Sequence, residues 1–168
     1  MSQERRRCFV AIRVPEAIQD LLDSVQNEIR ERVGCGVWTR RGNLHLTLKF
    51  LGDLEPYQIR VGKDELKRIA GRHPAFSMWF GGIGVFPRLE CPRVLWIGVT
   101  TGAIEVAAIA QEINVVLSNF GFPTDEQPFC PHITLARFKK RTSLSALTDI
   151  FQQYKQYNRI DGAAMVVQ

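Results

Sequence analysis

The sequence predicts an α+β protein made of two similar lobes that face each other across a groove. A strand–helix–strand pattern occurs twice within the 168 residues, and each copy ends in a strand reading His-x-Thr-Leu. The spacing is also repeated, since Val10 precedes His45 by 35 residues and Ile97 precedes His132 by 35 residues. We interpret this as a degenerate internal duplication. A pseudo-twofold axis would then place the two His-x-Thr strands on opposite walls of the groove.

The first copy begins with a β-rich run at residues 7–14, and Pro15 suits the start of a helix. Apolar residues then recur at helical spacing as far as Gly34. LHLTLKFLG at 44–52 is predicted to be a strand, 53–71 a polar-faced helix and AFSMWFGGIGVF at 75–86 a further strand. No GK[ST] and no helix follow GGIG, so this segment indicates a turn or bulge and not a phosphate loop.

The second copy repeats the order of elements. RVLWIGV at 93–99 is a predicted strand, and apolar residues at helical spacing over 104–120 predict a helix that Gly121 can end. A proline-rich connector at 122–131 leads into the strand HITLARF at 132–138. A helix at 143–155 and a strand at 159–168 are predicted to complete the chain.

Composition indicates one globular domain over residues 1–168, because 45% of the residues are hydrophobic and 23% are charged. No apolar run approaches the roughly 20 residues that span a bilayer, so we predict no membrane association. Arg13 interrupts the short apolar stretch near the N-terminus, which argues against a signal peptide and favours a cytoplasmic protein. The net charge of +5 mildly favours a polyanionic partner such as nucleic acid.

The four cysteines show no CxxC spacing, and we predict free thiols that pack mostly as small hydrophobic residues. An alternative is a metal site formed by Cys130, His132 and the distant His45. Structural zinc sites usually show paired ligands at short spacing, which this sequence lacks. We therefore predict no metal and no cofactor. The third histidine, His73, lies in a predicted turn and is expected to be solvated.

Each His-x-Thr word places an imidazole beside a hydroxyl. Side chains at i and i+2 of a strand share a face, so His45 lies beside Thr47, and His132 beside Thr134. Two histidines facing one groove suit acid–base chemistry, because near neutral pH one can be protonated while the other is neutral. Threonine hydroxyls and backbone amides can hold phosphate oxygens.

Basic residues next to both words agree with an anionic substrate. Arg40, Arg41 and Lys49 flank the first word, and the cations Arg137, Lys139, Lys140 and Arg141 follow the second. A solvated basic face is the alternative, and we favour it for Lys139, Lys140 and Arg141. The guanidinium of Arg137 could bind phosphate or stack on a base. A regular strand would point it away from His132, so a twist or bulge is needed to turn it toward the groove. Phe50 and Phe138 could stack a base, but core packing is their more ordinary role.

Four segments carry a resemblance to a known family: RCFVAIRVP at 7–15, LHLTLKFLGDL at 44–54, GVFPRLECPRVLWIGV at 84–99 and PHITLARFK at 131–139. In this order they resemble the RNA 2′,3′-cyclic phosphodiesterases, historically called 2′-5′ RNA ligases, of the 2H phosphoesterase superfamily. The resemblance covers most of the chain, and two HxT words among these neighbours are highly specific.

The resemblance implies a bilobal α+β fold with antiparallel sheets lining a central cleft. It implies metal-independent hydrolysis of RNA 2′,3′-cyclic phosphate ends, such as those of tRNA fragments or nucleotides, to 2′-phosphomonoesters, by a monomer. By similarity, His45 is the proton donor, His132 the proton acceptor, and Thr47 and Thr134 hold the phosphate. Reversible 2′-5′ ligation would use the same groups. From the sequence alone, either histidine could be the acid.

Two other functions stay open at this stage. One is an RNA-binding module that uses the same basic cleft without catalysis, and the other is a metal-dependent hydrolase. One departure from the family is also visible. We expect family members to continue past the last strand with a Ser-x-Leu segment and a tyrosine-bearing stretch, whereas this sequence ends at Gln168.

Overall fold

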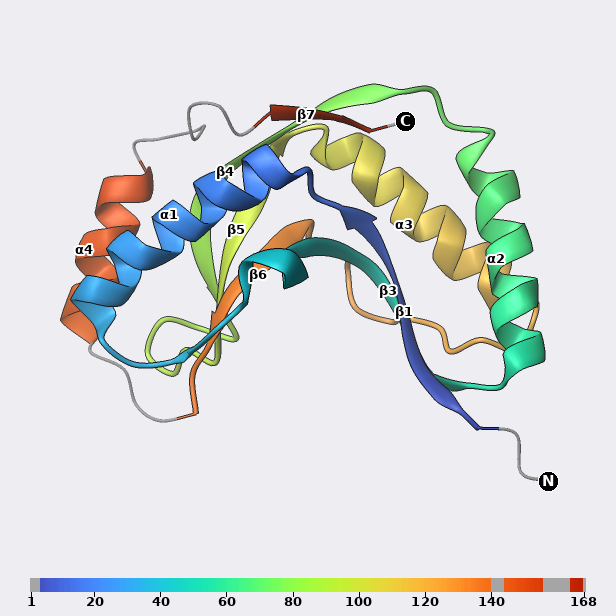
Figure 1. Ribbon diagram of the computed structural model, residues 1–168, viewed down its shortest axis with the longest axis horizontal. Helices are drawn as coiled ribbons and strands as arrows, with labels where there is room; N and C mark the ends of the chain where they lie inside the picture. The colour runs from blue at the N-terminus through green and yellow to red at the C-terminus, as the bar shows by residue number, and fades with distance from the viewer. Residues whose placement is uncertain (1–3, 140–143, 156–163, 168) are drawn as a thin grey trace.

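The chain folds into an antiparallel sheet flanked by two pairs of helices (Figure 1). The computed structural model describes residues 4–139, 144–155 and 164–167. The strands are β1 (Arg6–Arg13), β2 (Val37–Trp38), β3 (His45–Leu54), β4 (Phe76–Phe86), β5 (Val94–Thr101), β6 (His132–Arg137) and β7 (Ala164–Val167). The helices are α1 (Glu16–Val33), α2 (Pro56–Ala70), α3 (Ala103–Ser118) and α4 (Leu144–Lys155), with a 3₁₀ turn at Arg41–Asn43.

These elements confirm the predicted α+β class. The short strand β2 and the 3₁₀ turn were not predicted, because they are too short to show a hydrophobic period. The predicted strand at 159–168 is described only over Ala164–Val167. Among the described residues, no helix is both long and apolar enough to cross a membrane.

The order of the strands reflects the internal duplication. In the described part of the chain they form one sheet in the order β1-β3-β6-β5-β4-β7, with β2 also pairing with β6. The strand–helix–strand units of the two copies therefore meet where β3 lies beside β6, with β1 and β5 on the outer sides, and β4 of the first copy lies beyond β5, between β5 and β7. β3 and β6 pair only through Leu46 and Ile133. The antiparallel halves are thus joined narrowly at the point that a pseudo-twofold axis would cross.

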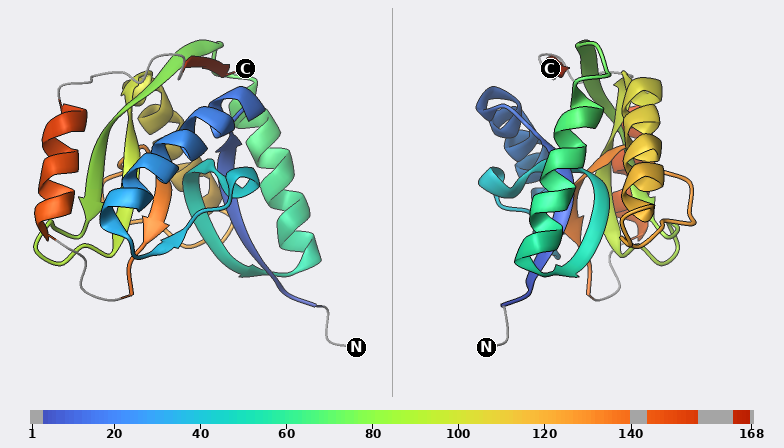
Figure 2. Two further views of the ribbon diagram at one scale, coloured as in Figure 1. Left: turned by 60° about the vertical axis from the view of Figure 1, so that its left-hand side comes forward. Right: turned by 90° about the vertical axis from the view of Figure 1, so that its right-hand side faces the viewer.

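The helices exchange partners between the two copies. α1 contacts β6 of the second copy, and α3 contacts β3 of the first. Figures 1 and 2 show α1 beside α4 at one end of the molecule and α2 beside α3 at the other. Apolar stripes on these helices cover a continuous core that includes Leu22, Leu46, Ile113 and Ile133, each at most 2% exposed.

Local sequence signals set the end of α1 and the start of α2. Gly34 ends α1 in the left-handed conformation, with φ of 70°, and its N–H donates to the carbonyl of Arg30. At the start of α2, Pro56 occupies the first turn, and the side chains of Glu55 and Gln58 form a capping box. Because α2 begins directly after β3, its cap also fixes where the first His-x-Thr strand stops.

Both His-x-Thr strands carry a β-bulge at the same place. The register of β3 against β1 leaves Leu48 as an extra residue, and the register of β6 against β5 leaves Leu135. Each bulge follows the threonine of its word and breaks the strict alternation of side chains. As a consequence, Phe50 and Arg137, five residues after the two histidines, are exposed.

The GGIG segment in β4 contains a bulge, as predicted. β4 pairs with β5 through Gly81 and then Ile83, which leaves Gly82 as the extra residue with φ of 67°. Gly84 has a different role. A Cβ atom at this position would lie 2.0 Å from Cζ2 of Trp96, so the missing side chain makes room for the indole.

Candidate active site

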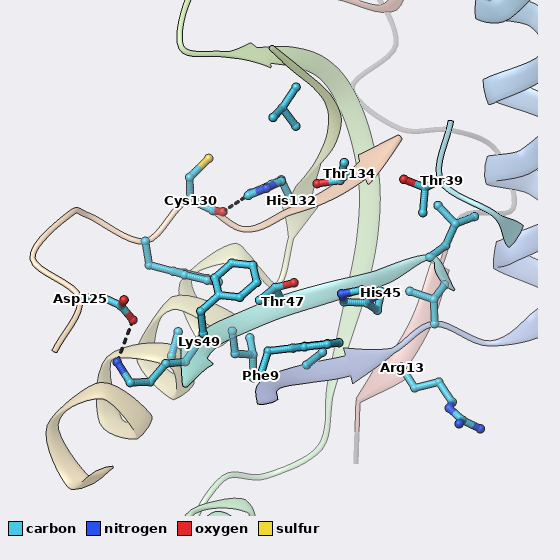
Figure 3. Close-up of a pocket in the computed structure, with 18 of the residues that line it drawn as sticks. Phe9, Arg13, Thr39, His45, Thr47, Lys49, Asp125, Cys130, His132 and Thr134 are labelled. Carbon is cyan, nitrogen blue, oxygen red and sulfur yellow. Dashed lines mark hydrogen bonds and ion pairs between the residues drawn. The ribbon is translucent and has the colours of Figure 1, made fainter. Parts of the chain in front are cut away.

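An open cleft of about 2040 Å³ lies along the junction of β3 and β6. All five sequence-predicted site residues line it: His45, Thr47, His132, Thr134 and Arg137. Figure 3 shows the first two on β3 and His132 and Thr134 on β6, on facing sides of the cleft. Pockets for small molecules are typically about 300–1,000 Å³. The larger, open cleft therefore suits a longer molecule of which only part is held.

The two imidazoles are held in the same way. Nδ1 of His45 lies 2.6 Å from the carbonyl oxygen of Asn43, and Nδ1 of His132 lies 2.7 Å from the carbonyl oxygen of Cys130. A carbonyl can only accept a hydrogen bond, so Nδ1 carries the proton in both rings. Nε2 is then left for chemistry, as an acceptor in a neutral ring or a donor in a protonated one. The duplicated backbone thus presents two equivalent acid–base groups.

The surroundings of His132 favour its neutral form. Burial is the largest influence and lowers the pKa of His132 below its ordinary value of 6.5. The hydrogen bond to the carbonyl of Cys130 raises the pKa, and the positive charge of Arg137 lowers it, but both effects are smaller than that of burial. Near neutral pH the ring is therefore mostly unprotonated and can accept a proton at Nε2.

The two threonines lie beside their histidines as the strand period predicted. Thr47 and Thr134 are half-buried and line the cleft. Neither hydroxyl donates a hydrogen bond to another residue within the described segments of the chain. Both hydroxyls are therefore available to a bound molecule.

Arg137 reaches the cleft because of the bulge in β6. The extra residue Leu135 shifts the residues after it, so Arg137 lines the same cleft as His132. Its guanidinium makes no ion pair among residues 4–139, 144–155 and 164–167. The cation is therefore free to face an anion in the cleft. Regular strand alternation would have placed Arg137 on the face opposite to His132.

Hydrogen bonds from two other elements hold this bulge. The carbonyl of Leu135 accepts from Nε2 of Gln26 at 2.6 Å and from the backbone N–H of Thr39 at 2.9 Å. Gln26 lies on α1 and is fully buried. The carbonyl of the extra residue is thus satisfied inside the protein, which fixes the bulge and the position of Arg137.

Two of the cations that flank the first word have partners inside the protein. Lys49 is buried, and its Nζ donates to Oδ1 of Asn114 at 2.6 Å and to Oδ2 of Asp125 at 2.9 Å (Figure 3). Arg41 forms an ion pair with Asp20. Both residues line the cleft but already have carboxylate partners within the protein, so their role toward an anionic substrate stays a prediction. Of the cations after the second word, Lys139 is exposed, while residues 140 and 141 lie outside the described part of the chain.

Aromatic rings surround both histidines, and sequence reasoning missed most of them. Phe9 stacks on His45 with ring centroids 4.8 Å apart. Phe86 meets His132 edge-on at 5.0 Å. Phe50 is 60% exposed in the cleft, so its expected role in the core was wrong. Phe138 is buried, as that expectation required. The contact between Phe9 and His45 depends on how β1 registers against β3, and sequence spacing alone does not give that register.

The cysteines and the third histidine differ from expectation. Cys35, Cys91 and Cys130 are exposed, so three of the four do not pack in the core. Within the described residues, no three His, Cys, Asp or Glu side chains are grouped to hold a metal ion. His73 is not simply solvated, because its Nε2 lies 2.6 Å from Oε2 of Glu112. It lies outside the cleft.

Solved structures share this fold. A protein of Thermus thermophilus superposes with a TM-score of 0.71 at 29% identity, covering 81% of this chain and 76% of that one. The apo form of E. coli LigT superposes with a TM-score of 0.70 at 23% identity, covering 98% of this chain and 84% of that one. The arrangement of strands around the cleft is thus known from other proteins.

Sequence comparisons identify the family. An RNA 2′,3′-cyclic phosphodiesterase of Aquifex aeolicus is 32% identical over 151 residues, which is 89% of this chain and 79% of that protein. An RNA 2′,3′-cyclic phosphodiesterase of Aeropyrum pernix is 39% identical over 113 residues, which is 66% of this chain and 62% of that protein. The family model of the 2′-5′ RNA ligase superfamily matches residues 9–167, which include both His-x-Thr strands. The chain therefore belongs to the 2′-5′ RNA ligase superfamily.

Proposed function

We propose that this protein hydrolyses RNA ends that carry a 2′,3′-cyclic phosphate to 2′-phosphomonoesters, using two histidines and no metal ion. The observation that carries the proposal is the pair of imidazoles with Nδ1 bound to a backbone carbonyl and Nε2 left free in one cleft. The relatives named RNA 2′,3′-cyclic phosphodiesterase support the choice of substrate. The RNA would be a tRNA fragment or a nucleotide.

In the proposed reaction the two histidines act on opposite sides of the phosphorus. Nε2 of neutral His132 takes a proton from water, and the water oxygen forms a bond to phosphorus. The bond between phosphorus and the 3′-oxygen breaks, and Nε2–H of protonated His45 donates its proton to that oxygen. The products are a 2′-phosphate and a 3′-hydroxyl. The lowered pKa of His132 is consistent with its role as the base.

Three further side chains would stabilise the phosphate as its charge shifts in the transition state. The hydroxyls of Thr47 and Thr134 can donate to the non-bridging oxygens. The guanidinium of Arg137 adds a positive charge on the His132 wall. If the 5′-hydroxyl of a second RNA replaced water, the same groups would form a 2′-5′ linkage, and they would exchange roles in the reverse direction.

The decisive experiment is product analysis on a defined oligoribonucleotide with a 2′,3′-cyclic phosphate end, in the presence of EDTA. We expect a 2′-phosphate product. His45→Ala and His132→Ala should each lower kcat about 10²–10⁴-fold, the usual contribution of one general acid or base. His73→Ala is the matched control, since this histidine lies outside the cleft, and it should keep the activity.

Three outcomes would contradict the proposal. Activity that disappears on chelation and returns with added metal would favour the metal-dependent hydrolase. RNA binding that weakens with salt, without turnover of any cyclic phosphate, would favour the RNA-binding module. Full activity in both cleft variants would exclude two-histidine catalysis. The monomeric state and the cytoplasmic location stay predictions from the sequence.

A further inference from the structure

We propose that Arg13 binds a second phosphate of the RNA, the one that joins the terminal nucleotide to the nucleotide before it. This inference rests on the proposed function and deepens it, because it names a residue with which the protein would select an RNA chain over a single nucleotide. Arg13 is the last residue of β1 and lies outside both His-x-Thr strands.

Arg13 lies beside His45 in the sheet. β1 and β3 are antiparallel, and their register pairs Arg13 directly with His45. Side chains at directly opposed positions share a face, with Cβ atoms about 4.5–5.5 Å apart. Both residues line the cleft, and Figure 3 shows Arg13 beyond His45, on the side away from His132. The guanidinium is thus next to the acid of the proposed reaction but not between the two histidines, where the reacting phosphorus would lie.

Within the described part of the chain, the guanidinium of Arg13 has no acidic partner. The residue is exposed, and among residues 4–139, 144–155 and 164–167 it takes part in no ion pair and no side-chain hydrogen bond. Glu16 also lines the cleft, but no ion pair joins it to Arg13 in these segments. Arg41, another arginine that lines the cleft, is paired with Asp20. Arg13 can therefore bind an anion without first giving up a partner.

The strand register places Arg13 and Arg137 toward the same end of the sheet. Leu46 of β3 pairs with Ile12 of β1 and with Ile133 of β6. Because β1 and β6 are both antiparallel to β3, they run in the same direction. Arg13 comes after Ile12 in that direction, and Arg137 comes after Ile133. Adjacent strands are about 4.7–4.9 Å apart, so the strands of the two cations are separated by roughly 10 Å. This arrangement suits two successive phosphates of one RNA strand.

The equivalent position on the other wall has no side chain. Gly98 of β5 pairs with His132. In the first copy this place is taken by Arg13, which pairs with His45. A Cβ atom at Gly98 would lie 3.2 Å from the carbonyl oxygen of Gly81, so the close approach of β4 favours glycine there. The cation opposite the histidine is therefore a feature of one wall and is not required by the duplicated fold.

The proposed reaction connects this cation to the RNA chain. His45 donates its proton to the 3′-oxygen, so the terminal ribose lies next to the His45 ring. The 5′-carbon of the same ribose carries the preceding phosphate, which a single nucleoside cyclic phosphate lacks. An arginine directly across from His45 can donate two parallel hydrogen bonds to the oxygens of that phosphate. Arg13 would therefore add affinity for RNA ends and none for mononucleotides.

The test compares two dinucleotides that both end in adenosine 2′,3′-cyclic phosphate and both have deoxyadenosine as the first nucleoside. They differ only in the link between the nucleosides, which is a charged phosphodiester in one and an uncharged methylphosphonate in the other. We expect kcat/KM of the native protein to be about 5-fold higher for the charged link, the upper range for an exposed ion pair. Arg13→Gln should bring this ratio close to one, and Arg13→Lys should keep part of it. A merely structural defect would lower kcat/KM for both substrates equally and leave the ratio unchanged.

Two further variants make the result specific. Arg40 is an exposed arginine that precedes His45 by five residues and does not line the cleft, so Arg40→Gln should keep the native ratio. Arg137→Gln removes the cation assigned to the reacting phosphate, so it should lower kcat/KM for both dinucleotides and also keep the ratio. If either of these variants removes the preference for the charged link and Arg13→Gln does not, the preceding phosphate lies elsewhere and the inference is wrong.

The remaining outcomes separate this inference from the proposed function. Equal kcat/KM of the native protein for the two dinucleotides, with both hydrolysed, would overturn the phosphate site at Arg13 and leave the phosphodiesterase intact. Hydrolysis of neither dinucleotide by the native protein would overturn both.

Discussion

Replacing Asp125 by Asn should destabilise the protein far more than removing the lysine that it binds. The ammonium of Lys49 has no exposed surface, whereas the side chain of Asp125 is 49% exposed. Asp125→Asn keeps the shape but leaves a buried cation without its counter-charge. Lys49→Met removes the buried charge and leaves a carboxylate that water can reach. Buried pairs typically show this asymmetry.

The structure sets the size of the effect. Charges 2.9 Å apart attract by about 6 kcal/mol at an effective dielectric constant of about 20, and by about 1.4 kcal/mol in bulk water. Because Asp125 is half exposed, solvent screens part of this attraction, and we expect Asp125→Asn to cost about 2–4 kcal/mol. Lys49→Met should cost about 0–1.5 kcal/mol, since Asn114 still binds the backbone N–H of Asp125.

Urea unfolding of the two single variants and the double variant measures these values. With a slope of about 2 kcal/mol per molar urea, Asp125→Asn should lower the midpoint by about 1–2 M. The double variant should be more stable than Asp125→Asn alone. Equal losses in both single variants, or a loss below about 0.5 kcal/mol for Asp125→Asn, would refute this account of the buried charge.

Three further predictions concern the cleft, the packing of Trp96 and the β6 bulge. The acid limb of the pH profile of kcat/KM should fall below pH 6.5, because burial and Arg137 keep His132 neutral, and Arg137→Gln should move that limb to higher pH. Gly84→Ala should cost about 1–3 kcal/mol in a thermal or urea unfolding experiment, because the added methyl group collides with Trp96. Gln26→Leu should cost about 1–3 kcal/mol and also lower kcat/KM, since it removes a donor from the carbonyl that holds the β6 bulge. An unchanged pH profile, an unchanged free energy of unfolding for Gly84→Ala, or unchanged stability and kcat/KM for Gln26→Leu would contradict the role given to that residue.

The partners of Lys49 could not be predicted from the sequence. It lies two residues after Thr47 in a basic neighbourhood, so a role toward an anionic substrate was a reasonable interpretation. Its partner Asp125 is 76 residues away and belongs to the connector before β6. A sequence pattern within one strand or helix cannot indicate a contact between residues that are 76 positions apart. The same contact joins β3 to the connector that carries Cys130, whose carbonyl orients His132.

The sequence by itself determined the repeated unit and the pairing of each histidine with a threonine. Both are local properties, because strand alternation has a period of two residues and needs no partner. The equal spacing of the two copies then predicted that His45 and His132 belong to one site, and both line one cleft.

Only the tertiary structure decided what surrounds these residues. A bulge depends on how a strand registers against its neighbour, so the cleft positions of Phe50 and Arg137 follow from the pairing with β1 and β5. Burial and charge pairing also depend on segments far apart in the chain. For this reason the difference between the two walls of the cleft, with the exposed rings of Phe9 and Phe50 on one and the cation of Arg137 on the other, became visible only in the folded protein.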